Sequence, residues 1–237
     1  METMDSRTRL LLGDANMRLL RNAHVAVFGV GGVGGYVCEA LARCGVGSLD
    51  LIDSDTVSVS NLNRQILALH STVGRDKTEV MCERIADIDS SVQVRTYKIF
   101  FTPENASDFD FSQYTYVVDA IDTVSGKIAL AEHCHEANVP LISSMGAGNK
   151  LHPELFEIAD IYETSVCPLA RVMRTELRKR GIPKLKVVYS KEIPQKPADG
   201  KVPESRGRHL PGSISFTPSA AGLILAGAVV RDILNIE

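Results

Sequence analysis

Four glycines stand close together in the order Gly29-x-Gly31-Gly32-x-Gly34, at the end of the apolar run 24–30. In a loop of this kind the first glycine allows a tight turn, the second lets the backbone approach a phosphate, and the last permits close packing of a helix on a strand. The helix that follows offers free N–H groups and the positive end of its dipole to an anion. The run therefore predicts a phosphate-binding loop, with a glycine-rich turn that binds nothing as the alternative.

Charged and amide side chains follow this loop in an order that favours one nucleotide over another. Asp53 stands where an acid bonds a ribose hydroxyl, an arrangement that suits both NAD and ATP. Beyond it come Asp55, Asn61, Arg64 and Lys77. A dinucleotide has only two phosphates and does not need two cations here, whereas a triphosphate carries more charge that arginine and lysine neutralise. The spacing therefore favours ATP.

A further acid, Asp122, follows the apolar run 115–121. Magnesium prefers one or two carboxylates together with phosphate oxygens. We therefore expect Asp122 to hold Mg²⁺ beside the phosphates that Arg64 and Lys77 neutralise. The alternative for each charged residue is a solvated surface side chain.

The elements that must position these residues alternate between strand and helix. Short apolar runs rich in β-branched residues predict buried parallel strands, and apolar residues at helical spacing predict helices. We expect strands at 24–30, 48–53, 92–100, 115–121 and 140–144, and helices at 32–44, 75–88 and 123–137. Right-handed crossovers between such elements build a Rossmann-like, doubly wound, mostly parallel α/β sheet, with ligands beyond the carboxyl ends of its strands.

After residue 144 the alternation gives way to a different pattern. We expect a strand at 154–162, a basic helix at 165–180, a strand at 184–190, a long loop at 194–213 and a last helix at 217–236. The pattern shows no internal repeat and no independent second domain. We therefore predict one domain, with a nucleotide-binding core at 1–150 and a substrate-binding extension at 151–237 that does not fold by itself.

Charge is distributed unevenly along the chain. The segment 171–208 holds twelve Lys/Arg and four Asp/Glu, a balance of +8 in a chain whose formal net charge is −3. A basic segment on an acidic body indicates a polyanionic partner, with a solvated surface of mixed charge as the alternative.

Composition excludes several classes of protein. The five cysteines form no C-x-x-C pair, so we expect neither a disulfide framework nor zinc, and free thiols suit a reducing cytoplasm. The histidines have no ligand spacing. Residues 1–22 lack the apolar stretch of a signal peptide. The longest apolar run, 220–230, is too short for a bilayer, which needs roughly 20 residues. We expect no membrane association.

These motifs together resemble the ThiF/MoeB/HesA superfamily, relatives of ubiquitin-activating enzymes that adenylate carboxylates. The matching pieces are the glycine loop, Asp55-x-Val57-x-x-Ser60-Asn61-Leu62-x-Arg64-Gln65, Val73-Gly74-x-x-Lys77 and Asp122. The resemblance implies Asp53 on the ribose, Arg64 and Lys77 on the phosphates, Asn61 near the phosphates and Asp122 near magnesium.

The N-terminal segment carries a further part of this resemblance. Ser6-Arg7, before Leu10-Leu11-Leu12-Gly13, is similar to a segment whose arginine reaches the nucleotide of the partner subunit. The resemblance therefore implies that Arg7 acts in trans, within a homodimer.

Within the superfamily the chain resembles the tRNA threonylcarbamoyladenosine dehydratase branch. The matching pieces are 143–153, 168–170 and 188–192. This implies ATP-dependent cyclisation of threonylcarbamoyladenosine in tRNA, and tRNA binding agrees with the basic segment. An adenylating activator of a ubiquitin-like sulfur carrier is the alternative, disfavoured because such activators bear two C-x-x-C pairs. An NAD-binding oxidoreductase or sensor is an alternative of another class that leaves Arg64, Lys77 and Asp122 without a role.

Cys167 precedes Pro168 at the expected start of a basic helix, where a thiolate is favoured. Two interpretations are open. Cys167 is a functional thiol, acting as a nucleophile or sulfur acceptor, or it is a structural thiol. In the family a sulfur-accepting cysteine stands where this chain has Gly212, which weakens the case for sulfur-transfer partners. We expect a Cys167→Ser variant to retain cyclisation.

Overall fold

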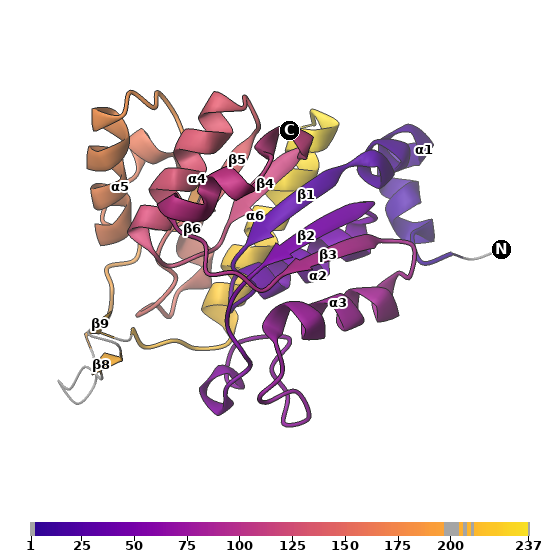
Figure 1. Ribbon diagram of the computed structural model, residues 1–237, viewed down its shortest axis with the longest axis horizontal. Coiled ribbons are helices and arrows are strands. Elements are labelled where there is room, and N and C mark those ends of the chain that lie inside the picture. Colours follow the sequence, from indigo (N-terminus) through magenta and orange to yellow (C-terminus); the bar gives the residue numbers. More distant parts are fainter. Residues whose placement is uncertain (1–2, 197–203, 206–207, 210, 237) are drawn as a thin grey trace.

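A seven-stranded sheet forms the centre of the computed structural model, which describes residues 3–196, 204–205, 208–209 and 211–236 (Figure 1). Its strands are β1 (His24–Phe28), β2 (Ser48–Ile52), β3 (Gln93–Tyr97), β4 (Tyr116–Asp119), β5 (Leu141–Ser144), β6 (Phe156–Asp160) and β7 (Lys186–Ser190). They lie in the order β3-β2-β1-β4-β5-β7-β6, and neighbours are parallel except for the antiparallel pair of β6 and β7. The predicted doubly wound, mostly parallel α/β fold is confirmed.

Helices cover both faces of this sheet. They are α1 (Ser6–Asn22), α2 (Gly34–Cys44), α3 (Lys77–Ile88), α4 (Val124–Glu136), α5 (Pro168–Lys179) and α6 (Phe216–Leu234). Helices α2, α3 and α6 share one face and α4 and α5 the other (Figure 1). Short 3-10 turns lie at Val59–Asn61, Pro103–Asp108, Phe111–Gln113, Pro153–Leu155 and Ile161–Glu163, and the two short strands β8 (Glu204–Ser205) and β9 (Arg208–His209) pair with each other.

Strand β1 shows how the sequence places the core. Val25 and Val27 pack into the hydrophobic cluster on the α2–α6 face, whereas Ala26 and Phe28 pack into the cluster on the α4 face. Successive side chains of a strand point to opposite faces, so a strand covered on both sides is apolar at every position. This is why continuous apolar runs predict the parallel strands.

The order of strands reverses between β1 and β4, which creates a crevice at their carboxyl ends. Gly29 follows β1 with φ +90°, and a Cβ at this position would lie 2.7 Å from the backbone oxygen of Ala120, which follows β4. Only glycine combines that backbone angle with that close approach. The first turn of the glycine loop therefore sits at the reversal point of the sheet.

Helix α1 was not predicted. It changes direction at Gly13, whose φ of 77° and ψ of 163° are not helical, and only Met17 and Leu20 are buried. Leu10 and Leu11 in its first half are 88% and 83% exposed. The first half of the helix contacts the main hydrophobic cluster only through the partly buried Leu12, so it shows no buried apolar stripe at helical spacing.

Other predictions differ from the structure at their boundaries. Helix α5 begins at Pro168 because proline is favoured at the first helical position, where its missing N–H costs no hydrogen bond. The strand expected at 92–100 ends at Tyr97, on an exposed edge of the sheet. Half of the loop expected at 194–213 lies outside the described residues, and its described part includes the short strands β8 and β9.

Helix α6 is long and apolar enough to cross a membrane by length and composition, but more than half of its apolar stretch is buried in the fold. It lies along the sheet beside α2 (Figure 1). A Cβ at Gly222 would lie 2.5 Å from the backbone oxygen of Val33, so the helix presses directly on the glycine loop. Its apolar character is explained by this core position, as the sequence predicted.

Candidate active site

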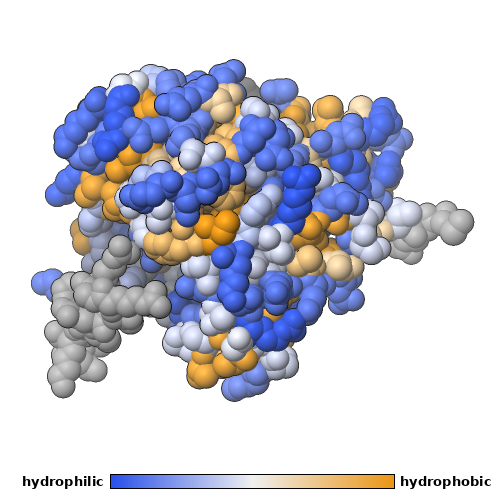
Figure 2. Space-filling view, viewed as in Figure 1, coloured by the Kyte–Doolittle hydropathy of each residue, from blue (hydrophilic) through white to orange (hydrophobic). Residues whose placement is uncertain are grey.

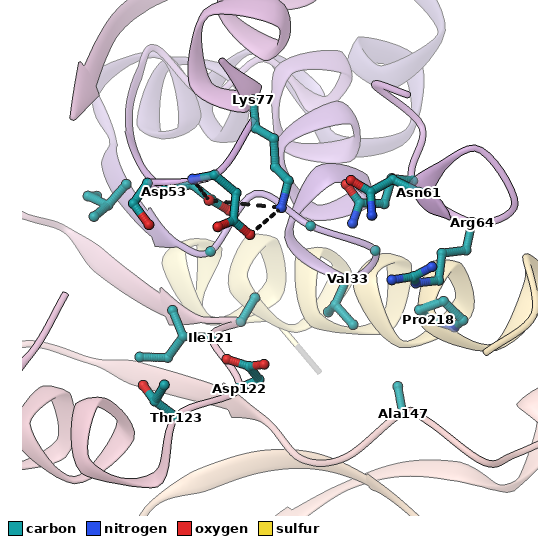
Figure 3. A pocket seen from close by; sticks show the side chains of 18 of the residues that line it. Val33, Asp53, Asn61, Arg64, Lys77, Ile121, Asp122, Thr123, Ala147 and Pro218 are labelled. Atoms are coloured by element: carbon teal, nitrogen blue, oxygen red, sulfur yellow. Dashed lines mark hydrogen bonds and ion pairs between the residues drawn. The ribbon is translucent and has the colours of Figure 1, made fainter. Parts of the chain in front are cut away.

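A cavity of about 440 Å³ lies at the reversal point of the sheet (Figure 3). This volume is typical of small-molecule sites. The predicted site residues that line it are Gly29, Gly31, Gly32, Asp53, Asp55, Asn61, Arg64, Lys77 and Asp122. Two predicted residues do not line it: Gly34, which starts α2, and Arg7, which is exposed on α1. The trans role of Arg7 stays a prediction.

The glycine loop brings the start of α2 against the end of β1. A Cβ at Gly34 would lie 1.7 Å from the backbone oxygen of Gly29, so no other residue fits without moving the helix. No side chain caps the first turn of α2. The Gly35 N–H already donates to the Gly31 carbonyl over 3.0 Å, whereas the N–H groups of Gly32, Val33 and Gly34 form no hydrogen bond among the described residues. These N–H groups can bind an anion beside the positive end of the α2 dipole.

Asp53 is fixed against the loop by two backbone hydrogen bonds. The Val30 N–H donates to Oδ2 over 2.7 Å, and the Asp55 N–H donates to Oδ1 over 2.8 Å. A carboxylate has about four acceptor positions, so it retains capacity for further donors such as ribose hydroxyls. The two hydrogen bonds therefore orient the Asp53 carboxylate and leave acceptor positions available for a ligand.

Lys77 delivers a positive charge from the first residue of α3. Its Nζ lies 2.8 Å from Asp55 Oδ2 and 4.0 Å from Asp53 Oδ1, and the residue is 5% exposed (Figure 3). The Lys77 N–H also donates to the Asp55 carbonyl over 3.1 Å. The lysine is therefore held between two carboxylates at the wall of the cavity.

Arg64 supplies the second cation, with different partners. Its Nη1 donates to the Ser60 carbonyl and to Asn63 Oδ1, both over 2.9 Å, and no described carboxylate forms an ion pair with it. Partial burial lowers the pKa of the Arg64 guanidinium from its ordinary value, yet an arginine in a protein stays protonated. A half-buried cation without a carboxylate partner is suited to an anionic ligand.

Asn61 and Asp122 differ in burial and in whether their side chains are already hydrogen-bonded. Asn61 is 8% exposed, and its Oδ1 accepts from the Ser58 N–H over 3.1 Å, so it shapes the turn that carries Arg64. Asp122 is exposed on the loop after β4 and points into the cavity from the side opposite Lys77 (Figure 3). Its carboxylate is the one at the cavity that no described cation pairs with, which fits a magnesium ligand.

A buried ion pair lies beneath the loop that carries Asp122. Lys127 Nζ lies 3.0 Å from both carboxylate oxygens of Asp119 and donates to the Ser144 carbonyl over 2.8 Å. Asp119 Oδ1 also accepts from the Ile121 N–H over 3.2 Å. This group joins β4, α4 and β5, and it holds the loop against the sheet.

Sequence reasoning missed several residues of the site. Gln65 is 7% exposed, lines the cavity, and has a buried Oε1 with no hydrogen-bond partner among the described residues. An orphaned polar atom at a cavity wall fits a polar ligand. In the sequence, only its position directly after Arg64 indicated that Gln65 could belong to the site. The other missed residues are uncharged and mostly apolar or small: Val33, Ile52, Ser54, Ile99, Phe100, Phe101, Ala120, Ile121, Thr123, Ala147, Gly148, Pro211, Ser213 and Pro218.

Cys167 lies away from this cavity and is 2% exposed. It stands just before α5 without capping it through its side chain. All five cysteines are free, and no three His, Cys, Asp or Glu residues in the described part of the chain gather as a metal site.

A second cavity, of about 670 Å³, lies where α4 ends and β5 begins. It is larger, but its acids are already engaged. Asp232 binds Lys186 Nζ over 2.6 Å, and Asp160 accepts from the N–H groups of Tyr162 and Leu185. Lys184 lines this cavity without an ion pair among the described residues, but the glycine loop does not, so the first cavity is the candidate active site.

Known proteins resemble this chain over almost its whole length. A tRNA threonylcarbamoyladenosine dehydratase of Bacillus subtilis (strain 168) is 44% identical over 239 residues, covering 97% of this chain and 94% of that protein. Crystal structures of the E. coli tRNA N6-threonylcarbamoyladenosine dehydratase in complex with AMP and with ATP superpose with a TM-score of 0.87. They are 34% and 33% identical, covering 97% of this chain and 93% of the E. coli chain.

The family assignment rests on the extent of the match as well as on identity. The sequence model of the ThiF family matches residues 6–236, which include the glycine loop, the two cations and Asp122. This chain belongs to the ThiF family.

Proposed function

We propose that this protein is an ATP-dependent tRNA threonylcarbamoyladenosine dehydratase, which adenylates the threonyl carboxylate of threonylcarbamoyladenosine in tRNA and promotes its cyclisation. The observation that carries the proposal is the convergence of Arg64, Lys77 and Asp122 on one cavity beside the glycine loop. The 44% identity to a dehydratase over 97% of the chain supports this choice over a sulfur-carrier activator.

The cavity accommodates the parts of ATP in order. The apolar residues Ile99, Phe101 and Ile121 offer a wall for the base, and Asp53 offers its remaining acceptor positions to the ribose. The glycine loop and the cations Arg64 and Lys77 then receive the phosphates. Asp122 would hold Mg²⁺, which supplies positive charge to the phosphate oxygens when bound.

The chemistry requires two anions to meet. The threonyl carboxylate attacks the α-phosphorus, the bond to pyrophosphate breaks, and an acyl adenylate forms. A nucleophile within the modification then attacks the acyl carbon and releases AMP, so that the oxygen lost from the carboxylate leaves with AMP. Arg64 and Lys77 offset the repulsion between the anions and the charge that develops at phosphorus. Because ring closure is intramolecular, no enzyme nucleophile is required.

The tRNA is proposed to contact the basic extension. Hydrophilic residues cover the side of the molecule where α5 lies (Figure 2). At the end of α5, Lys179 and the following Arg180 both pair with Glu176, and the Arg178 guanidinium lies 5.0 Å from the centre of the Tyr162 ring. Neither Arg171 nor Arg178 forms an ion pair among the described residues. Arg171 and Arg178 are therefore the best candidates on this helix for phosphate contacts.

The protein is further proposed to act as a cytoplasmic homodimer. Arg7 is exposed and lies outside the cavity of its own chain, next to Leu10 and Leu11, which are 88% and 83% exposed. A second copy would bury these leucines and receive the arginine. Sulfur transfer is not part of the proposal because Cys167 is 2% exposed and lies away from the cavity.

The extension 151–237 is proposed to be part of the same domain as the core. Strand β7 pairs with β5, and α6 packs on α2 and against the glycine loop. Removing the extension would expose the apolar residues that α6 covers on the sheet.

The direct test is mass spectrometry of nucleosides from tRNA that carries threonylcarbamoyladenosine, after incubation with the protein and ATP·Mg. We expect loss of one water from the modified nucleoside, dependent on ATP and matched by release of AMP. An unchanged nucleoside together with AMP transfer to a small carrier protein would favour the sulfur-carrier alternative. Stronger thermal stabilisation by NAD than by ATP·Mg would reject both.

A further inference from the structure

Asn149 lies in the connection that follows β5, next to two residues that line the candidate active site. Its φ is +57°, a left-handed conformation that asparagine adopts more readily than most residues. Ala147 and Gly148, just before it, line the cavity. The side chain of Asn149 has no role in the proposed reaction.

Three hydrogen bonds join Asn149 to two distant segments. Its backbone N–H donates to the Gly212 carbonyl over 2.8 Å, and the Gly212 N–H donates to Asn149 Oδ1 over 2.6 Å. Its own carbonyl accepts from the Gln195 N–H over 2.7 Å. One residue therefore ties together the chain before position 196 and the chain after position 211.

The segment Pro211–Ser213 is thereby pressed against the cavity, which both Pro211 and Ser213 line. A Cβ at Gly148 would lie 2.7 Å from Pro211 Cβ, so the loop that carries Gly148 directly contacts the segment Pro211–Ser213. On the other side Asn63, the neighbour of Arg64, donates from Nδ2 to the Ser213 carbonyl over 3.0 Å. The segment is thus held between Asn149 and the loop that supplies Arg64.

This wall faces the place proposed for the phosphates. Ala147 lies across the cavity from Lys77 and Asn61, and away from Ile121 and Thr123, where the base would bind (Figure 3). With the cations on one side of the phosphates, an attacking carboxylate approaches from the other side. The wall of Ala147, Gly148 and Pro211–Ser213 therefore borders the path of the carboxylate.

We propose that Asn149 is a positioning residue that clamps Pro211–Ser213 against the cavity and so fixes the path by which the tRNA-borne carboxylate reaches the nucleotide. The inference rests on the proposed function for the identity of that carboxylate. A preformed wall lowers the ordering cost that substrate binding would otherwise meet. Loosening the clamp should therefore weaken tRNA binding without changing how ATP binds.

The test is the variant Asn149→Gly, assayed with modified tRNA and ATP·Mg. Glycine keeps the left-handed backbone at no steric cost and removes only the side-chain acceptor. We expect KM for tRNA to rise roughly fivefold, the effect of losing about one hydrogen bond, while kcat and KM for ATP stay within about twofold. The matched control is Asn138→Gly, since Asn138 has φ +54° in the connection before β5 and does not line the active-site cavity. The control should leave all three parameters unchanged.

The outcomes separate this inference from the proposed function. A wild-type protein that does not dehydrate the nucleoside would reject the proposed function before Asn149 is assayed. With an active wild type, an unchanged KM for tRNA in Asn149→Gly would overturn the clamp. A fall in kcat alone would also overturn it, because that pattern reports a smaller folded fraction. An equal rise in both KM values would place the residue on the nucleotide side and reject the inference.

Discussion

Arg64 and Lys77 bring the same charge to one cavity but in different electrostatic settings. Lys77 lies 2.8 Å from Asp55 and 4.0 Å from Asp53, so its charge is already offset. Arg64 contacts only a carbonyl and an amide oxygen. The net positive charge presented to a triphosphate therefore comes mainly from Arg64. Both were found from sequence because each belongs to a short motif, whereas their different partners depend on the fold.

We expect Arg64→Ala to lose adenylation while the fold remains intact. Removing a group that stabilises charge in the transition state lowers kcat by about 10²–10³-fold. The free energy of unfolding should change by only about 0.5 kcal/mol, as for other partly exposed side chains without a buried partner. Pyrophosphate release and urea unfolding measure the two effects. The control is Arg75→Ala, an exposed arginine of the same region that pairs with Glu83 outside the cavity. Full AMP formation by Arg64→Ala would refute the role of this residue.

Cys167→Ser is expected to retain dehydration activity within about twofold, because serine is a favoured residue before a helix and the thiol lies away from the cavity. Product formation measured by nucleoside mass spectrometry tests this. Cys82→Ser, on α3, serves as the control for a thiol outside both regions. An inactive Cys167→Ser variant with a normal melting temperature would instead indicate that the Cys167 thiol acts as a nucleophile.

At the scale of elements, prediction succeeded where burial imposes a pattern and failed where packing is local or absent. Strands β1, β2, β4 and β5 were predicted because both of their faces are covered. Helix α1 was not, because its first half is exposed. The site divides in the same way. The charged residues belong to short motifs that the sequence displays, whereas Ala147 and Pro211–Ser213 belong to no charged motif and reach the cavity only through the fold.

A buried carboxylate on α2 binds an arginine of α3. Glu39 on α2 is 8% exposed and accepts from Arg84 Nε on α3 over 2.6 Å and from Arg43 over 2.8 Å. Burial raises the pKa of Glu39, but hydrogen bonds from Arg84 and Arg43 outweigh burial and leave the pKa below its ordinary value. A carboxylate with a depressed folded pKa stabilises the fold above its unfolded pKa, and this contribution disappears as pH falls through the folded value.

We therefore expect Arg84→Ala to lower the free energy of unfolding by about 1–2 kcal/mol at pH 7, since it removes hydrogen bonds to a charged group. The difference from wild type should shrink below about pH 4, as Glu39 becomes protonated. Urea unfolding at neutral and acid pH measures both. Arg43 forms a more exposed ion pair with Glu39 within α2, so Arg43→Ala should lower the free energy of unfolding by only about 0.5 kcal/mol. An equal loss at both pH values would contradict the role of ionised Glu39.

At the scale of the whole molecule, the proposal places a polyanion on a chain whose net charge is −3, so binding must depend on where the cations lie. We expect Arg171→Ala/Arg178→Ala to weaken tRNA binding and to lower the salt slope of log K by roughly 1 for each phosphate that the variant no longer neutralises. Fluorescence anisotropy over a series of salt concentrations measures this. Arg95→Ala, an exposed arginine on the edge strand β3, is the control. An unchanged slope in the double variant would remove α5 from the interface.

The trans role of Arg7 can be tested by mixing two inactive variants. Arg7→Ala and Arg64→Ala should each be inactive alone. In a dimer that contains one of each, the Arg7→Ala subunit keeps Arg64 and receives Arg7 from its partner, so one complete site forms. Random reassociation of equal amounts should restore about a quarter of wild-type activity, because half of the dimers are mixed and each has one working site. No recovery after subunit exchange would show that Arg7 does not serve the partner.

The Asp119–Lys127 pair beneath the Asp122 loop bears on how this protein can vary over generations. Both side chains are almost completely shielded from water, at 0% and 1% exposure. Changing either one alone would leave an unmatched charge in the interior, at a cost of about 3–5 kcal/mol, which is a large fraction of the roughly 5–15 kcal/mol that stabilises a typical domain. During evolution Asp119 and Lys127 can therefore be replaced only together, for example by a neutral pair that fills the same space. The Asp122 loop, which rests on this pair, is subject to the same constraint.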